Sequence, residues 1–411
     1  MARISQSHLN DVKRYLDSQL ERISGLKRLV VEAGYKWEDF PPERKANVFA
    51  IDGSRMVKRL SGAIIYAVSS VAVGEDILQW HEIGLVSPYK HVDERIRLHM
   101  EMLENRMGAL TFELKNADLI LMDGTLSGSI ARPPAYLESA TRHFYEEDKI
   151  GTVNLVKGFL ELLDSEWDKW KRALDEEGVI NYSTVMARRE EVFELLKPYV
   201  VEEELVEKIE SDPNYREDFI IFLEYLEYLH SIDKLLQGKV AFVAKTFYTD
   251  DIIKQVTEGK KESKHALMPD VPIIDSISKK RGYMRFRYRE TRKWSLPEVI
   301  KKAAGNKYLQ RVMFLFPEEG NPVQSIQPAY VRFIDNGVIY LLEAIELDDE
   351  LLSAILSVSE DEYIIPLEYA HHTVVIKKQE FDTYVDAILN ALIGEDKRYL
   401  AFLRYGREPL E

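Results

Sequence analysis

The stretch Val48–Ser54, with the sequence VFAIDGS, decides the fold, because an apolar run ends on the carboxylate of Asp52 where the chain must turn. A second stretch, Leu119–Thr125 (LILMDGT), ends in the same way on Asp123. Short apolar runs that stop at Asp-Gly are typical of buried strands. Two such strands bring both aspartates to the edge of a sheet, where clustered carboxylates hold a divalent cation.

The segments between these two stretches predict the type of sheet. Ala63–Val73 and Ile77–Val86 are rich in branched apolar residues and follow across short turns, so they predict an antiparallel meander. His91–Lys115 has apolar residues at helical spacing and is long enough to return the chain to the sheet. Three antiparallel strands, a helix and a fourth strand that carries a carboxylate are the order of the ribonuclease-H-like fold. We therefore predict an α/β protein with a mixed sheet flanked by helices.

The periodicity of the chain suggests four segments. We expect an amphipathic N-terminal helix within 1–44 and the first part of the ribonuclease-H-like core in 45–130. A helical insertion follows in 131–236, where apolar residues recur at helical spacing. The second part of the core, with a basic stretch and C-terminal helices, occupies 237–411.

Further strands are expected in the last segment. Lys239–Phe247 and Gln310–Phe316 are short apolar runs of the kind that form buried strands. Tyr330–Asp335 and Val338–Leu342 are joined by Asn336-Gly337, which is a strong signal for a hairpin turn.

Composition restricts the chemistry. The chain has 411 residues, a formal net charge of -15 and no cysteine. The lack of cysteine excludes disulfides, thiolate metal sites and a cysteine nucleophile, so oxygen and imidazole must hold any metal. There is no apolar run of about 18 residues and no signal-peptide pattern, so we expect a cytoplasmic protein that does not enter a membrane. Abundant Glu, Lys, Arg and Tyr favour a heat-adapted source.

A third carboxylate comes from the predicted helix. For either aspartate alone, an ordinary turn is the competing explanation, but two aspartates and a helix carboxylate together favour a metal site. Glu101 and Glu104 lie three residues apart near one helix face. Leu103, Met107 and Leu110 place the buried face beside Glu104, which we prefer, with Glu101 as the alternative.

Two adjacent histidines are candidates for a further ligand. His371 follows Ala370 and precedes an apolar run, and a single histidine in such a place is more often structural. Beside three carboxylates, however, a neutral imidazole suits a manganese-type site. The spacing does not choose between His371 and His372.

The segment Lys279–Trp294 has eight Lys or Arg and one Glu, interleaved with aromatic residues. Proteins that bind single strands combine cations for phosphates with rings for bases. If the segment is a strand, Arg285, Arg287 and Arg289 share one side and are available to DNA, while the apolar residues between them face the core. Lys245, directly after a strand, is a further candidate for holding phosphates.

A phosphatase of the haloacid dehalogenase type is an alternative. Met122–Leu126 (MDGTL) is similar to the Asp-x-Asp-Gly-Thr loop of those enzymes. That loop needs its nucleophilic aspartate at position 121, where this chain has leucine. The match lacks the residue that forms the phosphoenzyme.

Taken in order, three motifs resemble those of the archaeal NurA nuclease family. They are Phe49–Ser54 with Gly62, then Leu121–Leu126, then Tyr363-x-x-Pro366-Leu367-x-x-Ala370-His371. Residue by residue, the family's metal site falls on Asp52, Asp123 and His371, with Tyr363 nearby, and its glutamate falls on Glu104 or Glu101.

The resemblance implies a Mn²⁺-dependent 5′ to 3′ exonuclease and single-strand endonuclease, with Mg²⁺ as the alternative metal. It also implies a ring-like homodimer that works with the hexameric translocase HerA on DNA ends. Metal-assisted hydrolysis of a phosphodiester would use two ions about 4 Å apart on either side of the scissile phosphate. A catalytically silent ring that only docks the translocase is the remaining alternative.

Overall fold

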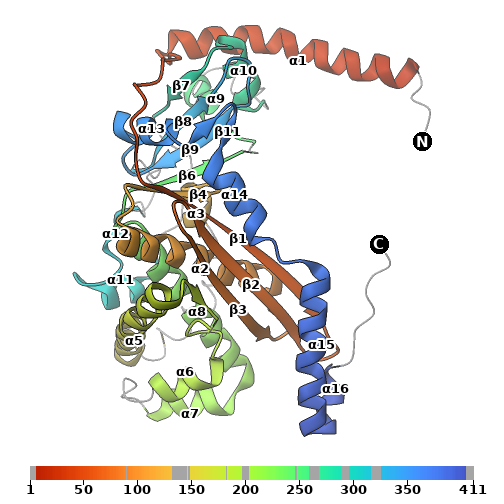
Figure 1. The fold of residues 1–411 in the computed structure, drawn as a ribbon, viewed down its shortest axis with the longest axis vertical. Coiled ribbons are helices and arrows are strands. Elements are labelled where there is room, and N and C mark those ends of the chain that lie inside the picture. The colour runs from red at the N-terminus through yellow and green to blue at the C-terminus, as the bar shows by residue number, and fades with distance from the viewer. Residues whose placement is uncertain are drawn as a thin grey trace.

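A computed structural model describes residues 6–88, 90–131, 146, 149–181, 183–196, 203–245, 248–258, 268–287, 296–315 and 325–403. Its centre is a mixed nine-stranded sheet with the order β5-β3-β2-β1-β4-β6-β9-β8-β7 (Figure 1). These strands are β1 (Val48–Arg59), β2 (Ile64–Val73), β3 (Ile77–Val86), β4 (Leu119–Asp123), β5 (Val179–Ile180), β6 (Val240–Ala244), β7 (Gly282–Arg285), β8 (Gln327–Arg332) and β9 (Tyr340–Ala344). A separate pair consists of β10 (Ser359–Glu360) and β11 (Tyr363–Ile364).

Strand β1 joins the antiparallel and the parallel parts of the sheet. It pairs antiparallel with β2, which pairs antiparallel with β3, so the predicted meander is confirmed. On its other edge β1 pairs parallel with β4, with Ile51 opposite Met122. One step further along the two strands, Asp52 and Asp123 come side by side. Strand β6 then lies parallel to β4, with Val243 opposite Asp123.

Helices cover both faces of the sheet, as Figure 1 shows. One face packs on helices α2, α5 and α8, and the other packs on α13 and α14. The helices are α1 (Gln6–Glu32), α2 (Val92–Lys115), α3 (Leu126–Ala131), α5 (Lys149–Glu177), α6 (Arg189–Leu196), α7 (Glu203–Ser211), α8 (Pro213–Leu235), α9 (Asp251–Thr257), α10 (Asp270–Ile277), α11 (Glu298–Ala304), α12 (Gln310–Leu315), α13 (Asp349–Leu356), α14 (Ile365–Val374), α15 (Lys378–Glu395), η3 (Lys397–Tyr399) and α16 (Leu400–Leu403). Among the described helices, none is long and apolar enough to cross a membrane.

Two sequence-based expectations need correction. The predicted strand Gln310–Phe316 is wrong for its described part, which forms helix α12. The Asp233 carboxylate accepts hydrogen bonds from the backbone N–H groups of Arg311 and Val312, and this tertiary cap stabilises a helix over the apolar run. The predicted amphipathic N-terminal helix packs on the protein only towards its C-terminal end, where Leu26 and Val30 of α1 are buried. Its apolar residues Leu9, Val12, Leu16 and Leu20 are exposed.

Buried ion pairs fix helix α2 against α8. The Arg95 guanidinium donates to Glu224 at 2.8 Å, and both side chains are fully buried. His99 lies between Glu82 and Glu224, with nitrogen–oxygen distances of 3.2 and 3.3 Å. Burial alone would lower the pKa of His99, but the hydrogen bonds and charges of these two carboxylates raise it from 6.5 to about 9. The fold therefore contains a protonated histidine in its core at neutral pH.

This histidine predicts a specific pH dependence of stability. Because the pKa of His99 is higher in the folded chain, its contribution is fully present below about pH 6.5 and is lost as the pH rises through about 9. We expect His99→Gln to lower the free energy of unfolding more at pH 6 than at pH 9.5. Urea unfolding of both proteins at the two pH values measures this difference. Equal destabilisation at both values would show that His99 is not charged in the folded protein.

Candidate metal centre

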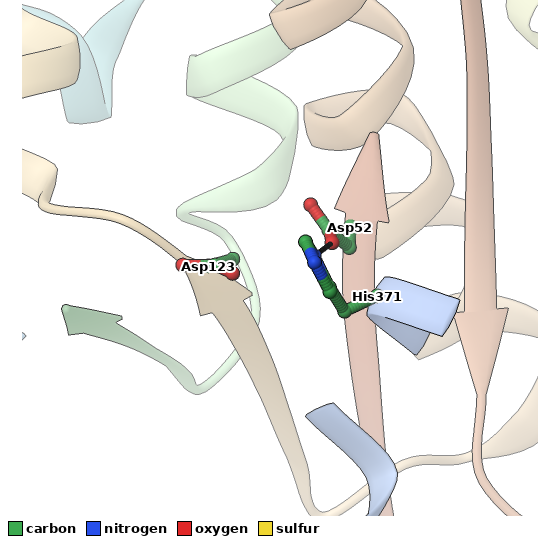
Figure 2. A group of neighbouring side chains, drawn as sticks. All are labelled: Asp52, Asp123 and His371. Carbon is green, nitrogen blue, oxygen red and sulfur yellow. Dashed lines mark hydrogen bonds and ion pairs between the residues drawn. The ribbon is translucent and has the colours of Figure 1, made fainter. Parts of the chain in front are cut away.

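Asp52 is buried within β1, with 8% of its surface exposed. The strand continues to Arg59, so the turn expected directly after Asp52 is wrong. Its Oδ1 accepts a hydrogen bond from the backbone N–H of Gly53 at 2.8 Å. Its Oδ2 lies 2.8 Å from Nδ1 of His371, which comes from helix α14 (Figure 2). Both carboxylate oxygens of Asp52 are therefore fixed in direction by the protein itself.

Asp123 ends β4 beside Asp52, as Figure 2 shows. Gly124, with a φ of 113°, turns the chain towards α3, and its N–H donates to the carbonyl of Val243 at 2.9 Å. At the start of α3 the Glu343 carboxylate accepts hydrogen bonds from the N–H and Oγ of Ser127 at 2.7 and 2.8 Å. The turn that carries Asp123 is thus anchored on β6, the neighbour of β4, and on β9, the next strand of the sheet.

The three side chains form a possible ligand set for a divalent cation. Among the described residues, ligand atoms of Asp52, Asp123 and His371 all lie within 4.8 Å of one another. Burial, followed by the charge of Asp52, raises the pKa of Asp123 to about 6, although Lys245 and His371 act in the opposite direction. Such carboxylate crowding favours a cation that neutralises it, and carboxylate with imidazole suits Mn²⁺.

The structure distinguishes Glu104 from Glu101. The Glu104 side chain lies against Gly53, the residue next to Asp52 in β1. Burial, then the charges of Asp52 and Asp123, raises the pKa of Glu104 well above its ordinary value. Glu101 has partners elsewhere, because it accepts from Arg97 at 3.0 Å and from the Tyr228 hydroxyl at 3.2 Å.

The position of His371 follows from the packing of α14. Leu367, Ala370 and Val374 are its buried residues, so the helix lies on the sheet and presents the next residue to Asp52. The end of the helix is tied to the strands, since Ser69 Oγ donates to the carbonyl of Val374 at 3.0 Å. His372 is exposed, with its ring 5.8 Å from that of His371. The geometry therefore selects His371 rather than His372 as the partner of Asp52.

The positively charged side chain of Lys245 lies at the edge of this group. Lys245 follows β6 and forms an ion pair with Glu368 of α14, and both side chains are partly exposed. Lys245 lowers the pKa of Asp123 and Glu368 raises it, so both side chains lie near that carboxylate. Sequence reasoning missed Glu368. Its position three residues before His371 on a helix, on the same face, is the signal that could have found it.

The remaining predicted residues lie further out. Tyr363 on β11 is 49% exposed and forms no hydrogen bond to Asp52, Asp123 or His371, all of which are described. Tyr363 directly precedes α14. Burial, followed by the charges of Glu368, Glu362 and Tyr363, raises the pKa of Tyr340 to about 12.

The described part of the basic stretch, residues 279–287, lies away from Asp52, Asp123 and His371. Met284 and Phe286 are buried while Arg285 and Arg287 are exposed, so the predicted alternation holds for the described residues. Arg285 forms an ion pair with Asp349 at 2.9 Å on the edge strand β7. Four strand spacings separate β7 from β4, which is roughly 19 Å across the sheet. Arg289 lies outside the described residues.

Comparisons with known proteins place this chain among relatives. The NurA domain family matches residues 46–376. The DNA double-strand break repair nuclease NurA of Pyrococcus furiosus is 29% identical over 469 aligned residues, which cover 100% of both chains.

Solved structures give the same result. A crystal structure of NurA with manganese is 27% identical and has a TM-score of 0.70, covering 94% of this chain and 99% of that one. NurA bound to dAMP and manganese is 26% identical and has a TM-score of 0.72, covering 95% of this chain and 98% of that one. The matched residues 46–376 include Asp52, Asp123 and His371, and this chain belongs to the NurA family.

Proposed function

We propose that this protein is a Mn²⁺-dependent nuclease that hydrolyses phosphodiester bonds of DNA. The observation that carries the proposal is the group of Asp52, Asp123 and His371, whose ligand atoms lie within 4.8 Å of one another. Its support is that a 26% identical relative of known structure is described as bound to dAMP and manganese. A nucleotide and a metal in a relative are what a phosphodiesterase site of this composition would take.

We assign the core to the ribonuclease-H-like class. The support is the strand order β3-β2-β1-β4-β6, with an antiparallel meander followed by parallel strands. On this assignment, residues 45–130 and 237–411 build the core, and 131–236 is a helical insertion that packs α5 and α8 against α2. The metal centre then lies where parallel strands β1 and β4 deliver their aspartates.

The roles of the residues follow from their positions. Asp52, Asp123, Glu104 and His371 would hold the metal, and Asp52 is the central ligand because His371 and Gly53 direct its two oxygens. Bound Mn²⁺ supplies a Lewis acid that polarises the phosphate and lowers the pKa of an attacking water. We expect two ions, one on either side of the scissile phosphate, as in two-metal phosphodiester hydrolysis.

Lys245 is placed to bind a phosphate next to Asp123. Its present partner Glu368 is partly exposed, so a phosphate group can compete for the ammonium. Arg285 and Arg287 would contact DNA further along the sheet, and their contribution should weaken as salt rises. Tyr363 would approach the phosphate from β11, directly before α14.

The substrates and partners that we propose come from the family. They are single-stranded DNA and DNA ends, degraded from 5′ to 3′ by exonuclease action and internally by endonuclease action in double-strand-break end resection. The protein would act in the cytoplasm as a homodimer with a HerA-type hexameric translocase. Exposed apolar side chains on α1 support assembly, because large exposed apolar patches are more often covered by partners.

The direct test uses purified protein and a labelled single-stranded oligonucleotide with Mn²⁺, Mg²⁺ or EDTA. We expect degradation in Mn²⁺ and none in EDTA. A silent docking ring would degrade no DNA in any divalent metal. A phosphatase would form a trapped aspartyl phosphate, which we do not expect because Leu121, in place of the nucleophile, is fully buried in the core.

The pair Glu104 and Glu101 provides a matched comparison. We expect Glu104→Gln to lower Mn²⁺-dependent turnover about 10- to 100-fold, because it removes a charge that faces both aspartates. Glu101→Gln should leave turnover within about twofold and lower the free energy of unfolding by about 1–3 kcal/mol, because it weakens the bonds from Arg97 and Tyr228. Turnover on DNA and urea unfolding measure both. The reverse pattern would assign the metal-binding role to Glu101.

A further inference from the structure

Gly53 lies against the side chain of Glu104. A Cβ atom at position 53 would come within 2.2 Å of Glu104 Oε1, 2.8 Å of its Cδ and 2.9 Å of its Cγ. Non-bonded heavy atoms pack at about 3.5–4.0 Å, so a side chain here and the observed Glu104 conformation exclude each other. The three closest atoms all belong to one carboxylate side chain, and none belongs to the backbone.

The backbone at Gly53 does not itself require glycine. Gly53 lies within β1 in regular register with Ser70 of β2. Its φ is not in the positive region, unlike that of Gly124. Alanine can adopt this extended conformation without strain. The requirement for glycine at this position therefore comes from space alone.

The sheet explains why Glu104 needs this space. Phe49 and Ile51 of β1 face helix α2, so the alternation of a strand also points position 53 towards α2. Asp52 points to the opposite face, where α14 brings His371. Strand β4 ends at Asp123, and in the described chain β1 beyond Ile51 pairs with β2 alone. Glu104 thus comes from the α2 face, its carboxylate lies against Gly53 where β4 no longer pairs with β1, and the charges of Asp52 and Asp123 both act on it.

We propose that Gly53 is a positioning residue whose missing side chain opens the passage through which Glu104 reaches the metal centre. This inference rests on the proposed nuclease function, because it gives Glu104 its task. Gly53 touches neither the metal nor the substrate and acts through Glu104. Any side chain at position 53 displaces the Glu104 carboxylate from the two aspartates.

The test is a double-mutant cycle of Gly53→Ala with Glu104→Ala. We expect Gly53→Ala alone to weaken Mn²⁺ affinity and turnover about 10- to 100-fold. Alanine at position 104 lacks Cγ, Cδ and Oε1, the three atoms that a Cβ at position 53 would meet, so it leaves room for the added methyl group. In the Glu104→Ala background, Gly53→Ala should therefore change both quantities less than about threefold, an interaction that contacting residues show and distant ones do not.

The readouts are Mn²⁺ titration calorimetry, the turnover number and KM on single-stranded DNA. Gly394→Ala is the matched control, because a Cβ there meets nothing within 4 Å. If Gly53→Ala does not fold, Gly53→Ala with Glu104→Ala should fold again, and failure of this double variant would overturn the inference. Equal losses of Mn²⁺ affinity and turnover from Gly53→Ala in the two backgrounds at position 104 would also overturn the inference. So would a Gly53→Ala protein whose Mn²⁺ affinity and turnover match those of the unchanged protein.

These outcomes are distinct from a failure of the proposed function. The nuclease proposal fails if the unchanged protein neither binds Mn²⁺ nor degrades DNA. Only the inference about Gly53 fails if the unchanged protein binds Mn²⁺ and degrades DNA, and the Gly53→Ala protein does so equally well.

Discussion

Replacing Asp52 with asparagine is expected to reduce Mn²⁺-dependent DNA degradation about 10³-fold or more, which corresponds to a loss of about 4 kcal/mol of transition-state stabilisation. Asparagine has nearly the same shape, and its Oδ1 can still accept from Gly53 N–H, so the strand should remain folded. What disappears is the negative charge of the proposed central ligand. The imidazole of His371, which lies 2.8 Å from Asp52 Oδ2, also loses its charged partner.

The measurement is single-turnover cleavage of a labelled oligonucleotide in Mn²⁺, with Mn²⁺ titration calorimetry on the same preparation. Asp76→Asn is the matched control, because Asp76 is largely exposed and pairs only with Lys115 in the described structure. Surface pairs of this kind contribute little to stability, so this variant should behave as the unchanged protein does. Undiminished cleavage by Asp52→Asn from a clean preparation would remove Asp52 from the site.

Replacing Glu227 with alanine is expected to lower the free energy of unfolding by about 3–5 kcal/mol. Glu227 and Arg106 are both fully buried, 2.6 Å apart. The same carboxylate accepts hydrogen bonds from the N–H groups of Val185 and Met186 at 3.0 and 2.8 Å. Its removal leaves the buried Arg106 guanidinium without a carboxylate among the described residues, although the guanidinium still lies 4.1 Å from the centre of the Trp170 ring. The two amide N–H groups that Glu227 accepted from also lose their partner.

Urea unfolding at constant pH measures this loss. Glu207→Ala on α7 is the matched control, since Glu207 is exposed and its replacement should change stability by no more than about 0.5 kcal/mol. A double variant, Arg106→Met with Glu227→Leu, should recover much of the loss, because an apolar pair needs no charge compensation. A change below about 1 kcal/mol in Glu227→Ala would show that the Arg106 charge is satisfied in another way.

Local sequence patterns predict the positions of Asp52 and Asp123 on strands because a short apolar run is a short-range feature. They do not predict that β1 continues past Asp52 to Arg59, because that continuation depends on pairing with β2. They do not decide between Glu101 and Glu104. Residues three apart on an α-helix differ by only about 60° in direction, so periodicity assigns both to nearly the same face. The decision comes from Tyr228, which is 127 residues away and bonds Glu101.

The same reasoning explains the error at α12. A short apolar run is compatible with either a strand or a helix, and Asp233 caps it from a position 78 residues earlier. The pairing of Lys245 with Glu368 depends on the docking of α14 across 123 residues of intervening chain. Such long-range contacts leave no periodic trace in the sequence.

The bond between Asp52 and His371 joins residues separated by 319 positions, and α14 follows all nine strands of the central sheet. During synthesis, a nascent chain that has already formed β1 and β4 still lacks the imidazole. On the proposed assignment, a ribosome-bound fragment would carry both aspartates but an incomplete site. DNA cleavage would then be delayed until the whole sheet and α14 have been made, which would protect the cell from partly made nuclease.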